Sequence, residues 1–125
     1  MQRRTLHRQK FEAYVQDGPK IAIFDIGTRA IRILIGSKNH TDVWEYKHFF
    51  NASILTNFGE DIDKRRRVHT HSKGLQNIIS FMNDFIPLLR RDGIEIHAFG
   101  TAVSRWIHNA SDTIEYIRRM TSVEI

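Results

Sequence analysis

The chain has no cysteine, only two prolines and no long apolar run. Without cysteine it has no disulfide framework, no thiolate metal site and no cysteine nucleophile. None of its apolar stretches approaches the roughly 18 residues that a membrane-spanning helix needs. The N-terminus is basic and has no apolar segment ahead of a cleavage site, which argues against a secretory signal. We therefore expect a cytoplasmic protein that has no membrane partner.

The charge of the chain is concentrated at its N-terminal end. The 125 residues carry a formal net charge of +5. Residues 1–20 hold five Lys and Arg residues against two acids, so +3 of that charge lies there and only +2 lies in residues 21–125. A chain of this length suits one domain. We predict a basic tail over residues 1–19, which can attract polyanions without specificity, and one domain over residues 20–125.

Apolar periodicity predicts a mixed α/β domain. Apolar runs at 21–26, 30–36 and 43–50 are separated by turns too short for a crossover helix, so they should form an antiparallel meander. A helical stripe over 72–90 should carry the chain back, so that a strand at 94–100 runs parallel to the first strand. Pro87 lies inside the stripe and predicts a kink or an early end of the helix near Phe85.

The remaining segments predict a polar linker, two helices and part of a strand. Residues 53–71 are polar and indicate irregular structure. Helices are expected over 101–108 and 112–120, the second with Asp112 and Glu115 as an N-capping pair. Val123–Ile125 indicates the start of a fifth strand. The resulting order, β-β-β-α-β-α-(β), is that of a truncated ribonuclease H-like, actin-like half-lobe.

Two loops carry the candidate functional residues. In the first, Gly27 allows backbone N–H groups to approach an anion, Thr28 adds a hydroxyl and Asp25 offers a carboxylate to a cation. In the second, Thr101 follows a strand at the expected start of a helix, whose N-terminus favours anions, and Arg105 lies one turn further on. From the residues alone, ordinary turn geometry and a surface arginine are alternatives that stay open.

Three blocks of the sequence resemble the exopolyphosphatase/guanosine pentaphosphate phosphohydrolase (Ppx/GppA) family. They are Ala-Ile-Phe-Asp-Ile-Gly-Thr at 22–28, Phe-Gly-Glu-Asp-Ile-Asp at 58–63, and Gly-Thr-Ala-Val-Ser-Arg-Trp-Ile-His-Asn-Ala at 100–110. Their order and spacing match the N-terminal part of the first actin-like domain of that family over about residues 20–125. The third block, with its threonine, arginine and asparagine after a strand, is the most specific of the three.

The resemblance implies a hydrolase that removes terminal phosphate from polyphosphate or pppGpp with a divalent metal. It implies that Arg105 is the catalytic arginine near the scissile phosphate and that Asp25 lies near a Mg²⁺ ion. It also implies a substrate-binding set, which consists of Gly27, Thr28, Arg29 and Thr101. In such a site fixed cationic donors stabilise the charge that develops on phosphoryl oxygens.

The sequence also departs from the family pattern. Where the family has Ser-Asn-Ser after the first glycine, this chain has Thr28, Arg29 and Ala30. The family's glutamate base is expected just beyond Ile125, and the second phosphate loop and second lobe are absent. We therefore expect the chain alone to be inactive. Two other readings stay open: a non-catalytic module that binds polyphosphate, nucleotide or nucleic acid, and a domain whose sheet is completed by a second chain or another copy.

Two smaller features give weaker indications. His69 and His71 place two imidazoles close together, but the sequence offers no further ligands to complete a zinc site. The basic run Lys64–Arg67 suggests polyanion binding, but Glu60, Asp61 and Asp63 precede it. A solvated loop in which these charges compensate one another is therefore favoured over a dedicated nucleic-acid patch.

Overall fold

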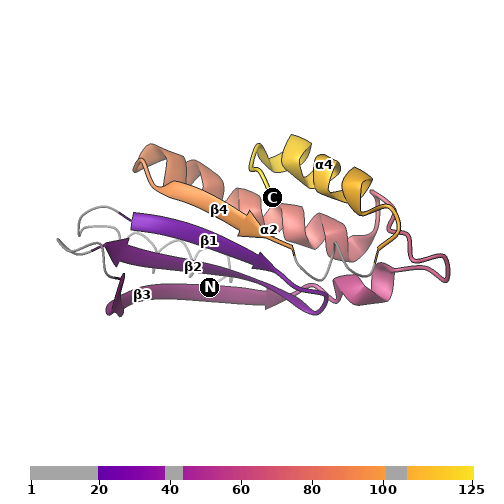
Figure 1. Cartoon of the computed structure of the whole chain (residues 1–125), viewed down its shortest axis with the longest axis horizontal. Helices are drawn as coiled ribbons and strands as arrows, with labels where there is room; N and C mark the ends of the chain where they lie inside the picture. Colours follow the sequence, from indigo (N-terminus) through magenta and orange to yellow (C-terminus); the bar gives the residue numbers. More distant parts are fainter. Residues whose placement is uncertain (1–19, 39–43, 101–106) are drawn as a thin grey trace.

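A four-stranded mixed sheet forms one layer of the domain (Figure 1). The computed structural model describes residues 20–38, 44–100 and 107–125. The strands are β1 (Lys20–Ile26), β2 (Ala30–Lys38), β3 (Trp44–Leu55) and β4 (Glu95–Phe99). Their order in the sheet is β3-β2-β1-β4. The pairings of β1 with β2 and of β2 with β3 are antiparallel, whereas β4 pairs with β1 in parallel, so the predicted meander and the parallel fourth strand are confirmed.

Helices form the second layer. The short 3-10 helix η1 (Phe58–Asp61) follows β3, and the helix α2 (Lys73–Arg91) is the crossover that connects the meander to β4. The helix α4 (Ala110–Thr121) follows β4 and lies beside α2 (Figure 1). The expected α/β class and β-β-β-α-β-α order are therefore present. No helix within the described residues is long and apolar enough to cross a membrane.

The core lies between one face of the sheet and the apolar stripe of α2. Alternate residues of β1 and β2 are buried, as strand geometry requires. Phe24 of β1 meets Phe81 of α2 edge-on at a centroid distance of 6.4 Å, and Phe50 of β3 meets Phe85 at 6.1 Å. The largest fully buried side chains are Phe24, Ile26, Ile31, Ile33, Ile35, Phe58, Leu75, Ile78, Met82, Phe85 and Leu89.

Polar contacts fix α4 along α2. The side-chain amide of Gln76 donates to the hydroxyl of Tyr116 at 3.1 Å. Near the other end of the helix pair, the guanidinium of Arg90 donates to the backbone carbonyl of Ser122 at 2.8 Å. Between them Ile117 is buried in the core. These contacts hold α4 along α2.

Of the two effects predicted for Pro87, the early end of the long helix is wrong, whereas the kink stays a prediction. α2 does not end near Phe85 but continues to Arg91 with Pro87 inside it. Ile86 and Leu89 extend the buried stripe past the proline. Burying these side chains compensates for the backbone hydrogen bond that proline removes, since each apolar side chain of this size contributes about 1.5–3 kcal/mol when buried.

The predicted N-capping pair at 112 and 115 is also wrong, because α4 begins two residues earlier. Asn109 precedes the helix, and its carbonyl accepts hydrogen bonds from both the N–H and the hydroxyl of Thr113, each at 3.0 Å. Glu115 instead pairs with Arg118 within the helix, and this guanidinium holds the pKa of the Glu115 carboxyl below its ordinary value.

The segment 53–71 and the C-terminal residues also differ from expectation. The segment is not irregular throughout, because β3 continues to Leu55, opposite Ala30, and 58–61 forms η1. Val123–Ile125 forms no strand. Ser122 adopts a left-handed φ of 59° that ends α4, and the N–H of Val123 bonds back to the Thr121 hydroxyl, so Val123 turns into the core.

Some predictions fall on residues outside the described ranges. The predicted tail over 1–19 lies there, as does most of the helix predicted over 101–108. The last two residues of that predicted helix, Ile107 and His108, are described and are not helical.

Candidate functional site

The first candidate loop is a tight turn that is hydrogen-bonded to the segment after β3. The N–H of Gly27 donates to the carbonyl of Ala30 at 2.9 Å and closes the turn between β1 and β2. The carbonyl of Thr28 accepts from Gly59 at 2.6 Å, and that of Arg29 accepts from the N–H of Thr56 at 2.9 Å. Two of the three sequence blocks, 22–28 and 58–63, therefore meet through their backbones.

The approach of these two segments leaves little room for a side chain at position 59. A Cβ atom on Gly59 would lie 3.2 Å from the Cβ of Thr28 and 3.4 Å from its carbonyl oxygen. The absence of a side chain there lets η1 lie directly against the turn. Gly59 therefore allows η1 to pack closely against Thr28.

Asp61 of the second block caps α2 from outside the helix. Its Oδ2 accepts a hydrogen bond from the N–H of Gly74 in the first turn at 2.6 Å. At this position a carboxylate also interacts favourably with the positive end of the helix dipole. The nominal cap, Ser72, makes no capping hydrogen bond, and its buried hydroxyl has no partner among the described residues. Gly74 has no room for a Cβ atom, which would overlap Asp61 and lie 2.8 Å from the Cα of Phe58.

The basic run forms a turn organised by Asp63. Its Oδ1 accepts the backbone N–H groups of Arg65 at 2.8 Å and Arg67 at 3.0 Å. The hydrogen bond from the Arg67 amide is the main reason why the pKa of the Asp63 carboxyl lies below its ordinary value, and the bond from the Arg65 amide adds to this effect. Within the turn Arg66 has a left-handed φ of 59°. The loop therefore has a defined conformation.

The segment before α4 fixes this loop in place. The side chain of Asn109 accepts the Val68 N–H at 3.0 Å and donates to the Val68 carbonyl at 2.9 Å, an arrangement that satisfies both backbone groups. The N–H of His108 donates to the carbonyl of Arg66 at 2.6 Å. The end of the third sequence block therefore contacts the loop that follows the second.

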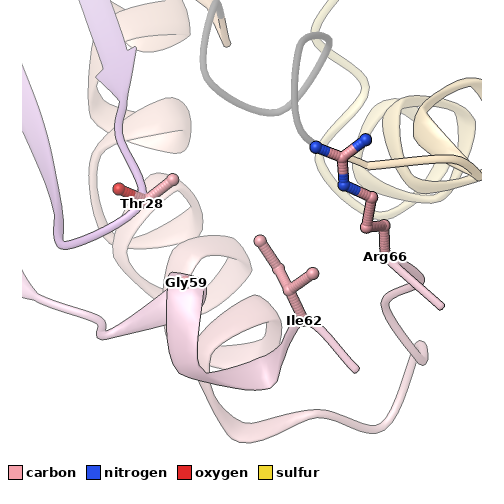
Figure 2. Close-up of a pocket in the computed structure, with 4 residues that line it drawn as sticks. All are labelled: Thr28, Gly59, Ile62 and Arg66. Atoms are coloured by element: carbon pink, nitrogen blue, oxygen red, sulfur yellow. The ribbon is translucent and has the colours of Figure 1, made fainter. Parts of the chain in front are cut away.

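An open pocket of about 500 Å³ lies between the turn 27–30, the segment 59–62 and Arg66. Figure 2 shows Thr28 and the Arg66 side chain on its two sides, with Gly59 and Ile62 between them. The lining therefore combines apolar surface with one cationic side chain, that of Arg66. The guanidinium group can donate hydrogen bonds to an oxyanion. The Thr28 hydroxyl points away from Ile62 and Arg66, and its methyl group points toward them (Figure 2).

The predicted site residues lie in different places. Thr28 lines the pocket, whereas Gly27 acts through the turn and the exposed Arg29 does not line the pocket. Asp25 is exposed opposite Arg32 of β2, and its side chain points away from the face that α2 covers. The predicted catalytic Arg105 and the predicted substrate ligand Thr101 lie outside the described residues, so their roles stay predictions.

The described residues do not assemble a metal site from protein ligands alone. They contain no group of three or more His, Cys, Asp or Glu side chains placed to hold an ion. His69 and His71 stack with ring centroids 5.5 Å apart, and His69 lies 3.6 Å from Asp63. Asp25 is a single carboxylate, which fits Mg²⁺ only if substrate phosphates and waters supply the other ligands, an arrangement this ion commonly adopts.

Sequence reasoning missed three residues of the site. From the sequence, Arg66 belongs to a basic run that is predicted to be solvated, and Gly59 and Asn109 are parts of motifs with no assigned structural role. The available signal is the spacing: a glycine and three acids at 59–63, followed by four basic residues at 64–67. That pattern is typical of a tight turn whose acids bind backbone amides.

The sequence and the fold give different results when they are compared with known proteins. No family profile and no curated protein matches the sequence. The fold matches the crystal structure of the Aquifex aeolicus member of the Ppx/GppA family with a TM-score of 0.69 and 17% identity, over 85% of this chain and 33% of that one. It also matches an exopolyphosphatase from Cytophaga hutchinsonii, with a TM-score of 0.66 and 17% identity over 84% and 32% of the two chains.

A third match has the same extent. It is the type II variant structure of the Aquifex aeolicus Ppx/GppA phosphatase, with a TM-score of 0.66 and 18% identity over 84% of this chain and 34% of that one. The chain thus spans about a third of the length of the solved structures that it resembles. The resemblance to the Ppx/GppA family that the three sequence blocks indicated is therefore confirmed at the level of the fold.

Proposed function

We propose that this chain forms part of the phosphate-binding cleft of a phosphoanhydride hydrolase of the Ppx/GppA type, with polyphosphate or a pppGpp-like nucleotide as substrate. The observation that carries the proposal is the meeting of the turn 27–30 with η1 beside a cationic pocket, within a fold shared with an exopolyphosphatase. The substrate and the reaction come from the resemblance and are what the experiment below tests.

Each proposed residue has a distinct task in such a cleft. Thr28 donates its hydroxyl to a phosphoryl oxygen, and Gly27 shapes the turn that presents it. Arg105 supplies a guanidinium to the scissile phosphate, and Thr101 lies at the entry to the same segment. Fixed donors of this kind lower the barrier by stabilising charge that increases in the transition state.

A divalent ion fits this cleft in a limited way. Mg²⁺, when bound, would supply charge neutralisation on the phosphoryl oxygens, with Asp25 as its protein carboxylate. Because Asp25 also faces Arg32 across the strands, we expect weak metal binding without substrate and stronger binding with it.

The first test measures binding and turnover with the 125-residue chain. Titration with tripolyphosphate and with pppGpp in the presence of Mg²⁺ should show binding. Thr28→Val, which keeps the shape and the backbone carbonyl but removes the hydroxyl, should weaken it about tenfold. Thr70→Val, on an exposed loop, is the matched control and should leave the affinity unchanged.

Phosphate release separates catalysis from binding. We expect the chain alone to release no phosphate above background. Turnover that Arg105→Ala abolishes would contradict this expectation of inactivity and would place a complete active site within these residues.

The second candidate is a non-catalytic module that holds the same anions. In this alternative the same pocket and the basic residues of segment 1–20 hold the anion without hydrolysing it. Binding that survives Thr28→Val and Arg105→Ala but disappears on removal of residues 1–19 would assign the affinity to the basic tail. A second copy that completes the sheet is tested by light scattering, in which a stable monomer would exclude it.

A further inference from the structure

The side of the sheet that faces away from α2 carries apolar side chains on its central strands. Strand residues alternate between the two sides of a sheet, and Phe24 and Ile26 of β1 are buried on the α2 side. The alternating residues Ile21 and Ile23 therefore point to the opposite side, where both are only partly buried. We call this side the outer face and define it by its apolar side chains, which are Ile21, Ile23, Leu34, Leu55 and Phe99.

The outer face extends across all four strands. Leu34 of β2 lies opposite Ile23 and is also partly buried. At the rim, Phe99 of β4 lies opposite Asp25 and is 56% exposed, and Leu55 at the end of β3 is 61% exposed. Apolar side chains that gather on one face in this way mark a surface that is suited to a partner.

The charged groups of the outer face compensate one another. Asp25 and Arg32 are cross-strand partners in the register of β1 and β2. On β4 the Oε1 of Glu95 lies 2.9 Å from the Nε2 of His97. Among the described residues of this face, opposite charges therefore lie side by side and leave little net charge to attract a polyanion. The face favours an occupant that presents apolar side chains.

The segment that precedes β1 has the sequence pattern of such an occupant. Phe11, Tyr14 and Val15 recur at i, i+3 and i+4, which predicts one apolar stripe on a short helix, here called the N-terminal stripe. Gly18 and Pro19 stand directly before β1 and favour a turn, through which the preceding chain can run back along the strand. A helix of about 11 residues is about 16 Å long and a seven-residue strand spans about 23 Å, so such a helix fits along β1.

We propose that residues 1–19 of this chain cover the outer face, with the N-terminal stripe packed against Ile23 and Leu34. This segment is favoured over a separate partner because its covalent link to β1 gives it an effective concentration at the face of about a millimolar. The sheet then has helices on both sides, and the basic N-terminal segment is a packed structural element instead of a free arm for polyanions. The inference does not depend on the proposed function, because docking of this segment requires no bound anion.

Because the chain has no cysteine, a single spin label can report where the segment lies. Ala13→Cys places a nitroxide on the side of the predicted helix opposite the N-terminal stripe. In the methyl NMR spectrum of the full chain, the label should broaden the signals of Ile23 and Leu34 strongly. It should broaden those of Ile78 and Leu89 less, because these residues of α2 are buried behind the sheet. Equal or stronger broadening of the α2 signals, or no broadening at either place, would overturn the proposal.

A mixing experiment distinguishes this chain's own segment from that of a second copy. Spin-labelled chains are mixed with isotope-labelled chains that lack the spin label. Broadening of Ile23 and Leu34 in that mixture would mean that another copy covers the outer face, and would overturn the proposal.

A matched pair of variants tests the packing itself. Phe11→Ser removes the largest side chain of the N-terminal stripe, so it should lower the melting temperature by about 5 °C and reduce the broadening of Ile23 and Leu34. Gln9→Ser lies on the opposite side of the predicted helix and should shift the melting temperature by less than about 2 °C. Equal shifts in the two variants would show that the stripe is not packed. A wild-type chain that binds no tripolyphosphate would contradict the proposed function but not this inference.

Discussion

The sheet with α2 and the edge that carries the pocket are built in different ways. The sheet and α2 are joined by many apolar side chains at regular spacing, so that each contributes a share of the same buried layer. The pocket edge, made of the turn 27–30, η1, the loop 63–67 and residues 107–109, is joined by a small number of hydrogen bonds between distant segments. The stability of the first region should fall when buried side-chain volume is removed. The stability of the second should fall when a single atom is added at a close contact or a single hydrogen-bonding atom is removed.

The largest effect is expected in the core. Phe24→Ala removes a fully buried ring that packs against Phe81, and should lower the free energy of unfolding by about 3–5 kcal/mol. Phe99→Ala is the matched control, because Phe99 on the neighbouring strand is 56% exposed, and it should cost less than about 1 kcal/mol. Urea unfolding measures both; similar losses would mean that the layer at β1 is not packed as described.

A single added methyl group should damage the pocket edge nearly as much. Gly74→Ala forces a Cβ atom into Asp61 and to within 3.0 Å of the Thr56 carbonyl, and should cost about 2–3 kcal/mol. Gly93→Ala has open space around the new Cβ but a φ of +66°, so it should cost only about 1 kcal/mol. If the two variants have the same melting temperature, the close contact of η1 with α2 is not present in solution.

Loss of the asparagine contact should have an intermediate effect. Asn109→Ala leaves the Val68 N–H and carbonyl without their partners in a partly buried position, and should cost about 1–2 kcal/mol. Asn83→Ala removes one exposed bond to the Met120 carbonyl and should cost less than about 0.5 kcal/mol. Hydrogen exchange at the Val68 amide provides a local check, because it should accelerate only in the Asn109 variant.

The smallest effect is a dependence on pH at Asp63. Its folded pKa lies below the ordinary value, so the ionised carboxylate stabilises the loop above about pH 4, and this contribution is lost as the pH falls through the folded pKa. Asp63→Asn keeps an acceptor for the Arg65 and Arg67 amides but removes the charge. The stability difference between wild type and variant should therefore shrink from pH 7 to pH 3; a difference that grows would contradict the assignment.

Most of the fold could be predicted because it depends on repeated patterns. The alternation of apolar residues in β1 and β2 and the apolar stripe of α2 predicted the meander, the crossover and the parallel fourth strand. The errors fell where tertiary contacts override a local signal. Pro87 is tolerated because the buried stripe continues past it, and α4 begins early because Asn109 is anchored to Val68. Asn109 and Val68 are 41 residues apart, so no local rule finds their contact.

The pocket was only partly predictable for a related reason. Thr28 was found because it follows a buried strand within a known type of turn. Arg66 was not found, because its side chain reaches the pocket through a backbone conformation that arginine rarely adopts. Charge counting along the chain treats Asp61 and Asp63 as neighbours of the basic run. The structure shows that their oxygens bind amides of α2 and of the turn.

The position of β1 in the sheet has a consequence for the order of folding. β1 pairs on one edge with β2, which follows after a tight turn, and on the other with β4, which follows only after β2, β3, η1 and α2. Local hairpins close with little loss of chain entropy, whereas a parallel pairing across a long crossover is slow. During refolding the meander should form first, and one edge of an apolar strand then lacks a partner until α2 has docked. That interval, more than the native state, is when this domain is exposed to intermolecular strand pairing.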